Sequence, residues 1–137
     1  MRRTDAFIDT NVALYLATSE PSKAAKAEAL IEAGGVISVQ VLTEFADVTH
    51  RKYKGAWPAI RQQLAALRGN LEVLPVTSET HDLGLVIAER YRFRVYDAQL
   101  IAAALQAGCT TFWSEDLHNG QVIENQLTIR NPFLAPQ

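Results

Sequence analysis

Asp9, Glu44, Asp97 and Asp116 are the residues in this chain whose types and positions could do chemistry together. Asp9 follows a short apolar run and Asp116 follows a β-prone run, so both are expected just beyond strand ends. Asp97 falls in the first turn of an apolar helix, and Glu44 lies at the edge of a helix's apolar stripe. Taken singly, each has an ordinary explanation, because carboxylates cap helices, form turns and lie on helix flanks.

Brought together, such a set of carboxylates would repel one another, and their pKa values would rise unless a cation bound. Mg²⁺ or Mn²⁺ suits this set, because both are hard cations that take oxygen ligands. The sequence has no cluster of His or Cys that would indicate zinc. A metal held by carboxylates can activate water and stabilise charge on a phosphodiester. The pattern therefore predicts metal-dependent hydrolysis of nucleic acid, with no nucleophilic side chain required.

The apolar patterning predicts strands that alternate with helices. Strands are expected at 6–8, 36–38, 71–76, 110–113 and 127–130. Helices are expected at about 12–16, 22–33, 39–53, 57–70, 77–91 and 95–107. This order implies right-handed crossovers and a three-layer α/β/α fold with a central, mainly parallel sheet of four to five strands. In such a sheet, residues that follow strand ends meet at one edge, where sites form.

Composition places the chain in an ordinary globular class. With 137 residues, 48% hydrophobic and 20% charged, it is expected to form a single domain over 1–137. A net charge of −2 counts against a simple DNA-binding surface, although not against an enzyme that holds phosphate through metal ions. The lack of a secretory segment, of a membrane span and of a second cysteine beside Cys109 predicts a cytoplasmic protein.

Two basic segments leave more than one interpretation open. Residues 51–54 (RKYK) form the densest basic cluster, which is typical of a solvated helix end but can also contact phosphate. Residues 90–94 (RYRFR) alternate arginines with aromatics, a pattern that can bind RNA by charge and stacking. An ordinary loop with two buried rings is the favoured interpretation of 90–94.

Two other enzyme classes that use parallel sheets fit less well. Phosphoryl transfer through an aspartyl-phosphate normally needs a late lysine, and no lysine follows Gly55. Dinucleotide binding needs a G-x-G-x-x-G motif after the first strand, and the sequence has none there.

Four segments, taken in order, resemble the PIN-domain family: FIDTN at 7–11, LTEF at 42–45, YDAQLIAAA at 96–104 and WSEDL at 113–117. Within that family the chain is similar to VapC-type toxins of type II toxin–antitoxin systems. The resemblance implies a PIN-like fold and a Mg²⁺- or Mn²⁺-dependent endoribonuclease. It also implies a homodimer and a cognate antitoxin protein that blocks the site.

The family's site residues fall on Asp9, Glu44, Asp97 and Asp116, with Asn11 and Ser114 at the supporting polar positions. Direct metal ligation is expected of Asp9 and Asp97. Glu44 is expected to ligate or to orient a metal-bound water, and Asp116 to bind a second or weaker metal. Glu115, beside Asp116, could share its metal role. The alternative is a catalytically silent PIN-like scaffold that binds RNA or protein, and the sequence does not name the RNA.

Overall fold

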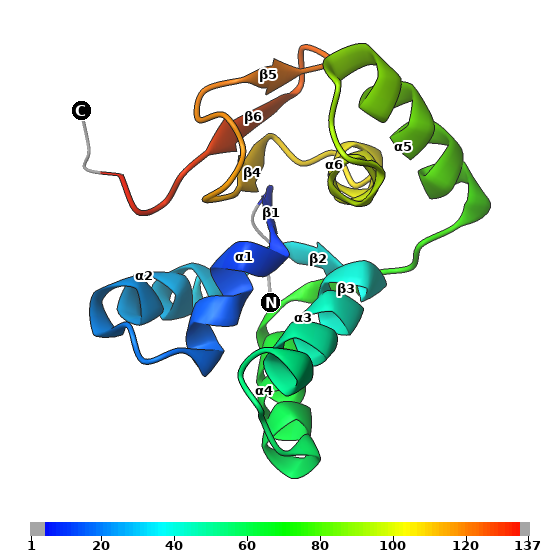
Figure 1. Ribbon diagram of the computed structural model, residues 1–137. Coiled ribbons are helices and arrows are strands. Elements are labelled where there is room, and N and C mark those ends of the chain that lie inside the picture. The colour runs from blue at the N-terminus through cyan, green and yellow to red at the C-terminus, as the bar shows by residue number, and fades with distance from the viewer. Residues whose placement is uncertain (1–4, 135–137) are drawn as a thin grey trace.

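The computed structural model describes residues 5–134 and is built on a six-stranded sheet (Figure 1). The strands, in chain order, are β1 (Ala6–Ile8), β2 (Val36–Ser38), β3 (Glu72–Leu74), β4 (Thr111–Trp113), β5 (Val122–Ile123) and β6 (Leu127–Arg130). Their order in the sheet is β3-β2-β1-β4-β6-β5. Every neighbouring pair is parallel except β5 and β6, which form an antiparallel hairpin. The mainly parallel α/β sheet predicted from the sequence is therefore confirmed.

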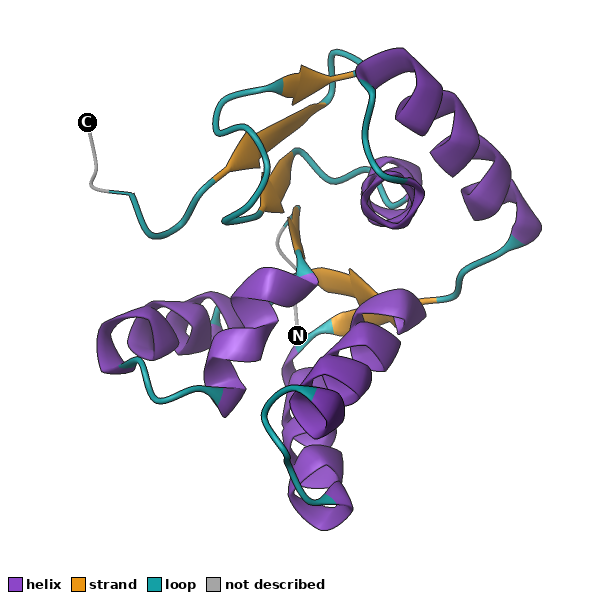
Figure 2. Cartoon of the chain, viewed as in Figure 1, coloured by secondary structure: helices purple, strands orange, loops and turns teal. Residues whose placement is uncertain are grey.

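Helices connect the strands and cover the sheet. They are α1 (Thr10–Ala13), the 3₁₀ helix η1 (Leu14–Ala17), α2 (Pro21–Glu32), α3 (Val39–Arg51), α4 (Trp57–Asn70), α5 (Ser78–Tyr91) and α6 (Val95–Gln106). The chain steps from β1 to β2 to β3 in one direction and then returns past β1 to β4. Right-handed crossovers therefore place α1–α4 on one face and α5 and α6 on the other, as Figure 2 shows in purple on either side of the orange strands.

The sheet and the apolar helix α6 lie in the centre of the core, and helices α1 to α5 also contribute buried residues to it. Leu100, Ile101 and Ala104 of α6 are buried, as its sequence predicted. Phe7 and Phe112 are paired on the adjacent strands β1 and β4, and their rings stack 5.3 Å apart. No helix within residues 5–134 is long and apolar enough to cross a bilayer.

Helices α5 and α6 pack closely because Gly84 has no side chain. A Cβ built at Gly84 would lie 3.2 Å from the Cα of Gln99, which is tighter than ordinary contact. Ala103 and the alanines beside it keep the rest of α6 narrow. The small residues thus determine how near α6 lies to α5.

The sheet has six strands where four to five were expected, because the short strand β5 was not predicted. Two residues are too few to show an alternating pattern. The turn that joins β5 to β6 uses Glu124 and Asn125 at φ of 53° and 54°. Glycine usually occupies one of these positions in such a turn, so this hairpin lacks its usual sequence signal. Helix α3 ends at Arg51, two residues before the predicted end.

Candidate active site

The carboxyl ends of β1 and β4 form a topological switch point. Connections from these neighbouring strands leave in opposite directions along the sheet, which opens a crevice beyond their ends. Asp9 directly follows β1, and its N–H donates to the carbonyl oxygen of Trp113 at 2.9 Å. Ser114 directly follows β4. Residues 105 positions apart therefore meet where α/β proteins usually bind ligands.

Asp9 is buried and is held by two polar side chains. The Ser114 hydroxyl donates to Oδ2 of Asp9 at 2.9 Å, and Nδ2 of Asn11 donates to the same oxygen at 3.2 Å. Asn11 Nδ2 also lies 3.1 Å from Oδ2 of Asp116. Asp9 occupies the N-cap position of α1, but its side chain makes no capping hydrogen bond. Asn11 and Ser114 are thus the two side chains that hold the carboxylate of Asp9.

Glu44 is half-buried, and both of its carboxylate oxygens accept hydrogen bonds. The Thr10 hydroxyl donates to Oε1 at 2.6 Å, and Nε2 of Gln40 donates to Oε2 at 3.0 Å. Gln40 is itself held by Nε2 of Gln99 on α6, at 2.7 Å. Thr10, Gln40 and Gln99 were not predicted from the sequence as site residues. The available signals were that Thr10 follows Asp9 and that Gln40 lies one helical turn before Glu44.

Asp97 lies in the first turn of α6 and is half-buried. The N-cap residue of α6 is Arg94, whose side chain makes no capping hydrogen bond. The carbonyl oxygen of Tyr96 accepts a hydrogen bond from Nε2 of Gln40 at 2.9 Å. Gln40 therefore links α3 to the start of α6, and these two helices cover opposite faces of the sheet.

The pKa values of Asp9 and Asp97 are affected by the charges of the other acids in the set. The pKa of Asp9 is raised from 3.8 to about 7, mainly by burial and in addition by the charges of Asp97 and Glu44, while the hydrogen bond from Ser114 lowers it. Burial also raises the pKa of Asp97, as do the charges of Glu44 and Asp116, while Arg94 lowers it. Such shifts are typical of functional sites.

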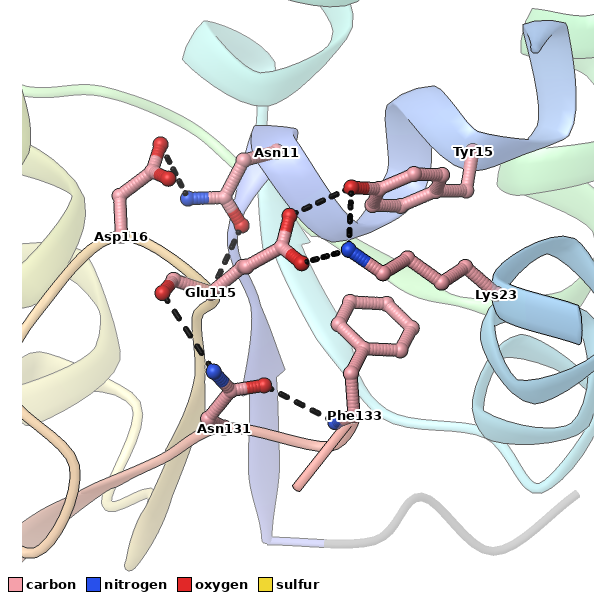
Figure 3. A network of polar contacts seen from close by, with 7 residues as sticks. All are labelled: Asn11, Tyr15, Lys23, Glu115, Asp116, Asn131 and Phe133. Atoms are coloured by element: carbon pink, nitrogen blue, oxygen red, sulfur yellow. Dashed lines mark hydrogen bonds and ion pairs between the residues drawn. The ribbon is translucent and has the colours of Figure 1, made fainter. Parts of the chain in front are cut away.

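Glu115 turns away from Asp116 into a network of its own (Figure 3). Its carboxylate accepts from the Tyr15 hydroxyl and from Nζ of Lys23, both at 2.5 Å. Burial acts to raise the pKa of Glu115, but the hydrogen bonds from Lys23 and Tyr15 outweigh it and the pKa is lowered. The ring of Phe133 packs edge-on against Tyr15 at 5.0 Å.

The backbone of Glu115 is fixed as well as its side chain. Its N–H donates to Oδ1 of Asn11 at 3.1 Å, and its carbonyl oxygen accepts from Nδ2 of Asn131 at 3.5 Å (Figure 3). Asp116, the next residue, is exposed and faces Asn11. The structure therefore gives Glu115 a role in holding the loop and leaves Asp116 as the loop's acid beside Asn11.

The segment 90–94 serves mainly to connect elements. The rings of Tyr91 and Phe93 are half-buried and stack 6.1 Å apart. The Tyr91 hydroxyl donates to Glu124 at 2.7 Å, and Arg90 forms an ion pair with the same residue. These contacts join α5 to the β5–β6 hairpin. Arg90 and Tyr91 belong to α5, so only residues 92–94 form the loop that was predicted for the whole segment.

The donor set suits a hard cation such as Mg²⁺ or Mn²⁺, since it consists of carboxylate oxygens supported by an amide and a hydroxyl. The ion pairs among residues 5–134 are Lys23–Glu115, Arg51–Asp47 and Arg90–Glu124, so none neutralises the four acids. No three His, Cys, Asp or Glu side chains in this range converge as a ready-made ligand set. Carboxylates repel one another, so convergence is expected only around a bound cation.

A family model for the PIN domain matches residues 6–120, and the chain therefore belongs to the PIN-domain family. No curated protein matches the sequence.

Among solved structures, the chain is similar to a toxin–antitoxin complex from Klebsiella pneumoniae (TM-score 0.70, 18% identity, 93% of this chain and 98% of that one). It is also similar to VapBC2 from Rickettsia felis bound to a promoter DNA fragment (TM-score 0.66, 19% identity, 92% of this chain and 97% of that one). A third similar structure is that of the sarcin-ricin loop cleaving toxin VapC20 of Mycobacterium tuberculosis (TM-score 0.61, 19% identity, 78% of this chain and 86% of that one). At these identities the likeness shows a shared fold.

Proposed function

We propose that this protein is a metal-dependent endoribonuclease of the cytoplasm and the toxin of a type II toxin–antitoxin pair. The observation that carries the proposal is the position of Asp9, a buried carboxylate at the switch point of the sheet. It lies in the field of further acids, with no lysine or arginine among residues 5–134 paired to it. Such a carboxylate is costly unless a cation binds there.

The roles follow from how each acid is held. Asp9 and Asp97 would hold Mg²⁺ or Mn²⁺ directly, and Glu44 would ligate or orient a water. Asp116, which is more exposed, would hold a second or weaker ion. When bound, the metal supplies an activated water and neutralises charge on the phosphodiester. Asn11 and Ser114 keep the carboxylate of Asp9 oriented by donating to its Oδ2.

The toxin role is supported by the fold shared with solved toxin–antitoxin complexes. The substrate class, RNA, is supported by the PIN-domain match and by the likeness to VapC20, a toxin that cleaves the sarcin-ricin loop. A cognate antitoxin that covers the acidic crevice and a homodimeric toxin are parts of the same proposal. Light scattering of the chain alone would test the homodimer, and coexpression with any small reading frame found beside its gene would test the antitoxin complex.

Incubation of the purified chain with total RNA and a transfer-RNA pool tests the enzymatic part. We expect discrete cuts with Mg²⁺ or Mn²⁺ and none with chelator. Asp97→Asn removes one charge with little change of shape and should lower the cleavage rate by at least about a hundredfold. Asp47→Asn is the matched control, because Asp47 is an exposed acid of α3 with no contact to the site. Equal cleavage by wild type and a folded Asp97→Asn variant would overturn the assignment.

A PIN-like scaffold that binds RNA without cutting is the second candidate. The observation that favours it is that residues 5–134 contain no preformed set of three metal ligands. A Mn²⁺ titration by calorimetry separates the two functions. Saturable uptake that is lost in Asp9→Asn supports the nuclease, whereas the absence of saturable uptake supports the scaffold.

A further inference from the structure

A cavity of about 250 Å³ opens directly beside the acidic crevice. Asn11 and Asp116 line its inner end, so the cavity is continuous with the candidate active site. Its outer end is lined by Val48, Lys52 and Tyr53, from the last turn of α3 and the residues that follow it. The cavity therefore joins the acids to the basic cluster of residues 51–54.

Tyr53 and Lys52 give the outer end an aromatic surface and a positive charge. Tyr53 is 41% exposed, and Nζ of Lys52 lies over one face of its ring, 5.6 Å from the ring centre, which leaves the other face for a base. An exposed ring beside a cation is the combination that binds single-stranded nucleic acid, because bases stack on rings and phosphates pair with cations. Leu14 and Val48 add apolar surface against which the edge of a base can pack.

The cavity wall carries a positive charge at the end lined by Lys52 and a negative charge at the end lined by Asp116. Glu115 also lines the cavity, but Nζ of Lys23 pairs with its carboxylate at 2.5 Å. A phosphate entering here therefore meets the uncompensated acids only at the inner end. That is where a bound metal would neutralise them.

A larger cavity of about 420 Å³ is a poorer candidate. It lies between the end of β3 and helices α5 and α6, is lined by residues such as Pro75, Thr77 and Glu79, and contains no lysine, arginine or aromatic ring. The smaller cavity is also below the roughly 300–1,000 Å³ of pockets that enclose drug-sized ligands. It suits a single base and its sugar.

We propose that this cavity binds the nucleotide that adjoins the scissile phosphate, with its base stacked on Tyr53 and a neighbouring phosphate paired with Lys52. The inference rests on the proposed function and narrows its substrate to RNA that is unpaired beside the cut, because only an unstacked base can enter. It makes Tyr53 and Lys52 substrate-binding residues outside the acidic set.

A titration of the ¹⁵N-labelled chain, followed by NMR, tests the site without requiring catalysis. The probes are 5′-AMP and 5′-UMP, with ribose 5-phosphate as the probe that lacks a base. We expect the nucleotides to shift the amide resonances of Lys52 and Tyr53 saturably, and ribose 5-phosphate to shift the resonance of Lys52 only weakly and to leave that of Tyr53 in place. Equal shifts from all three probes would mean that the cavity recognises only the phosphate and not the base, and the inference would be wrong.

Two pairs of variants locate the binding surface. Tyr53→Leu should weaken nucleotide binding about tenfold, because stacking of one base is typically worth that factor. Trp57→Leu is its control, since it removes a ring that is 46% exposed but does not line the cavity. Lys52→Gln should weaken binding of the nucleotides, whereas Lys54→Gln should not. Wild-type affinity in Tyr53→Leu would overturn the inference.

Cleavage kinetics separate this inference from the nuclease proposal. In a wild type that cuts RNA, Tyr53→Leu should raise KM about tenfold with Mn²⁺ binding unchanged. An unchanged KM would contradict the base-binding inference and would leave the nuclease proposal standing. If the wild type cut no RNA while the nucleotide titration still depended on the base and on Tyr53, the nuclease proposal alone would fail.

Discussion

At the scale of single residues, the buried carboxylate of Asp9 couples the stability of the fold to pH. Folded Asp9 keeps its proton up to a pKa of about 7, whereas the unfolded chain releases it near 3.8. Between these values the unfolded state binds fewer protons. The free energy of unfolding contributed by Asp9 is therefore fully present below about pH 4, falls as the pH rises to about 7, and stays constant above it.

Asp9→Asn should remove this pH dependence. At pH 8 the variant should be more stable than wild type by on the order of 2–4 kcal/mol, because no buried charge remains. At pH 4 the two should be nearly equal. Urea unfolding at several pH values measures the difference, with Asp47→Asn as an exposed control. Parallel stability curves for wild type and Asp9→Asn would contradict this account.

Glu115 and Asp116 are neighbours with opposite expected phenotypes. Glu115→Gln weakens the contacts with Lys23 and Tyr15 that hold the loop, so RNA cleavage should fall about tenfold while the number of bound Mn²⁺ ions is unchanged. Asp116→Asn should lower Mn²⁺ affinity itself. Calorimetry beside cleavage assays distinguishes the two variants. Loss of a Mn²⁺ ion in Glu115→Gln would instead make Glu115 a ligand.

At the scale of elements, the spacing of α5 and α6 reaches the site through Gln99. Gly84→Ala places a methyl group 3.2 Å from the Cα of Gln99. Such overpacking costs about 1–3 kcal/mol, and the better helix propensity of alanine returns about 1 kcal/mol. We expect a net loss on the order of 1 kcal/mol. Cleavage should also be slower, because Gln99 positions Gln40 and thereby Glu44.

Gly69→Ala is the matched control for this prediction. Gly69 lies in α4, and a Cβ built on it meets nothing within 4 Å. Only the propensity gain remains, so this variant should be more stable than wild type by about 0.5–1 kcal/mol and should cleave normally. Thermal unfolding of both variants measures the contrast, and equal effects would show that α5 and α6 are not tightly packed.

The elements also show what the sequence could and could not predict. The β1 strand and α6 were predictable because their apolar patterns are strong. The positions of Asp9 just after β1 and of Asp97 in the first turn of α6 could be predicted from them. The β5 strand was not, since it has two residues and an unusual turn. Gln99 was missed because its partner Gln40 lies 59 residues away, and no local pattern marks such a pair. Gln40 could have been found, since it lies one helical turn before Glu44.

At the scale of the whole molecule, the four acids come from both helical layers and from the sheet between them. Glu44 lies on α3, Asp97 lies on α6 across the sheet, and Asp9 follows the central strand β1. A bound cation would thus connect all three layers. We expect Mn²⁺ at about 100 times its Kd to stabilise the wild type by about 2.7 kcal/mol.

Thermal unfolding with and without Mn²⁺ measures that stabilisation. Asp97→Asn should lose most of it, because one layer no longer contributes a ligand, whereas Asp47→Asn should retain it. A Tm in wild type that does not respond to Mn²⁺ would indicate that the acids hold no metal, and it would favour the scaffold over the nuclease.

The pairing of β1 with β4 also bears on biosynthesis. Asp9 leaves the ribosome well before Ser114, because the hydroxyl that orients it is made 105 residues later. At about 5–20 residues per second, translation takes roughly 5–20 s to cover that distance. During this interval the nascent chain carries its first acid without the strand that completes the crevice. A ribosome making this protein is therefore not exposed to an assembled site until β4 and Ser114 have been made.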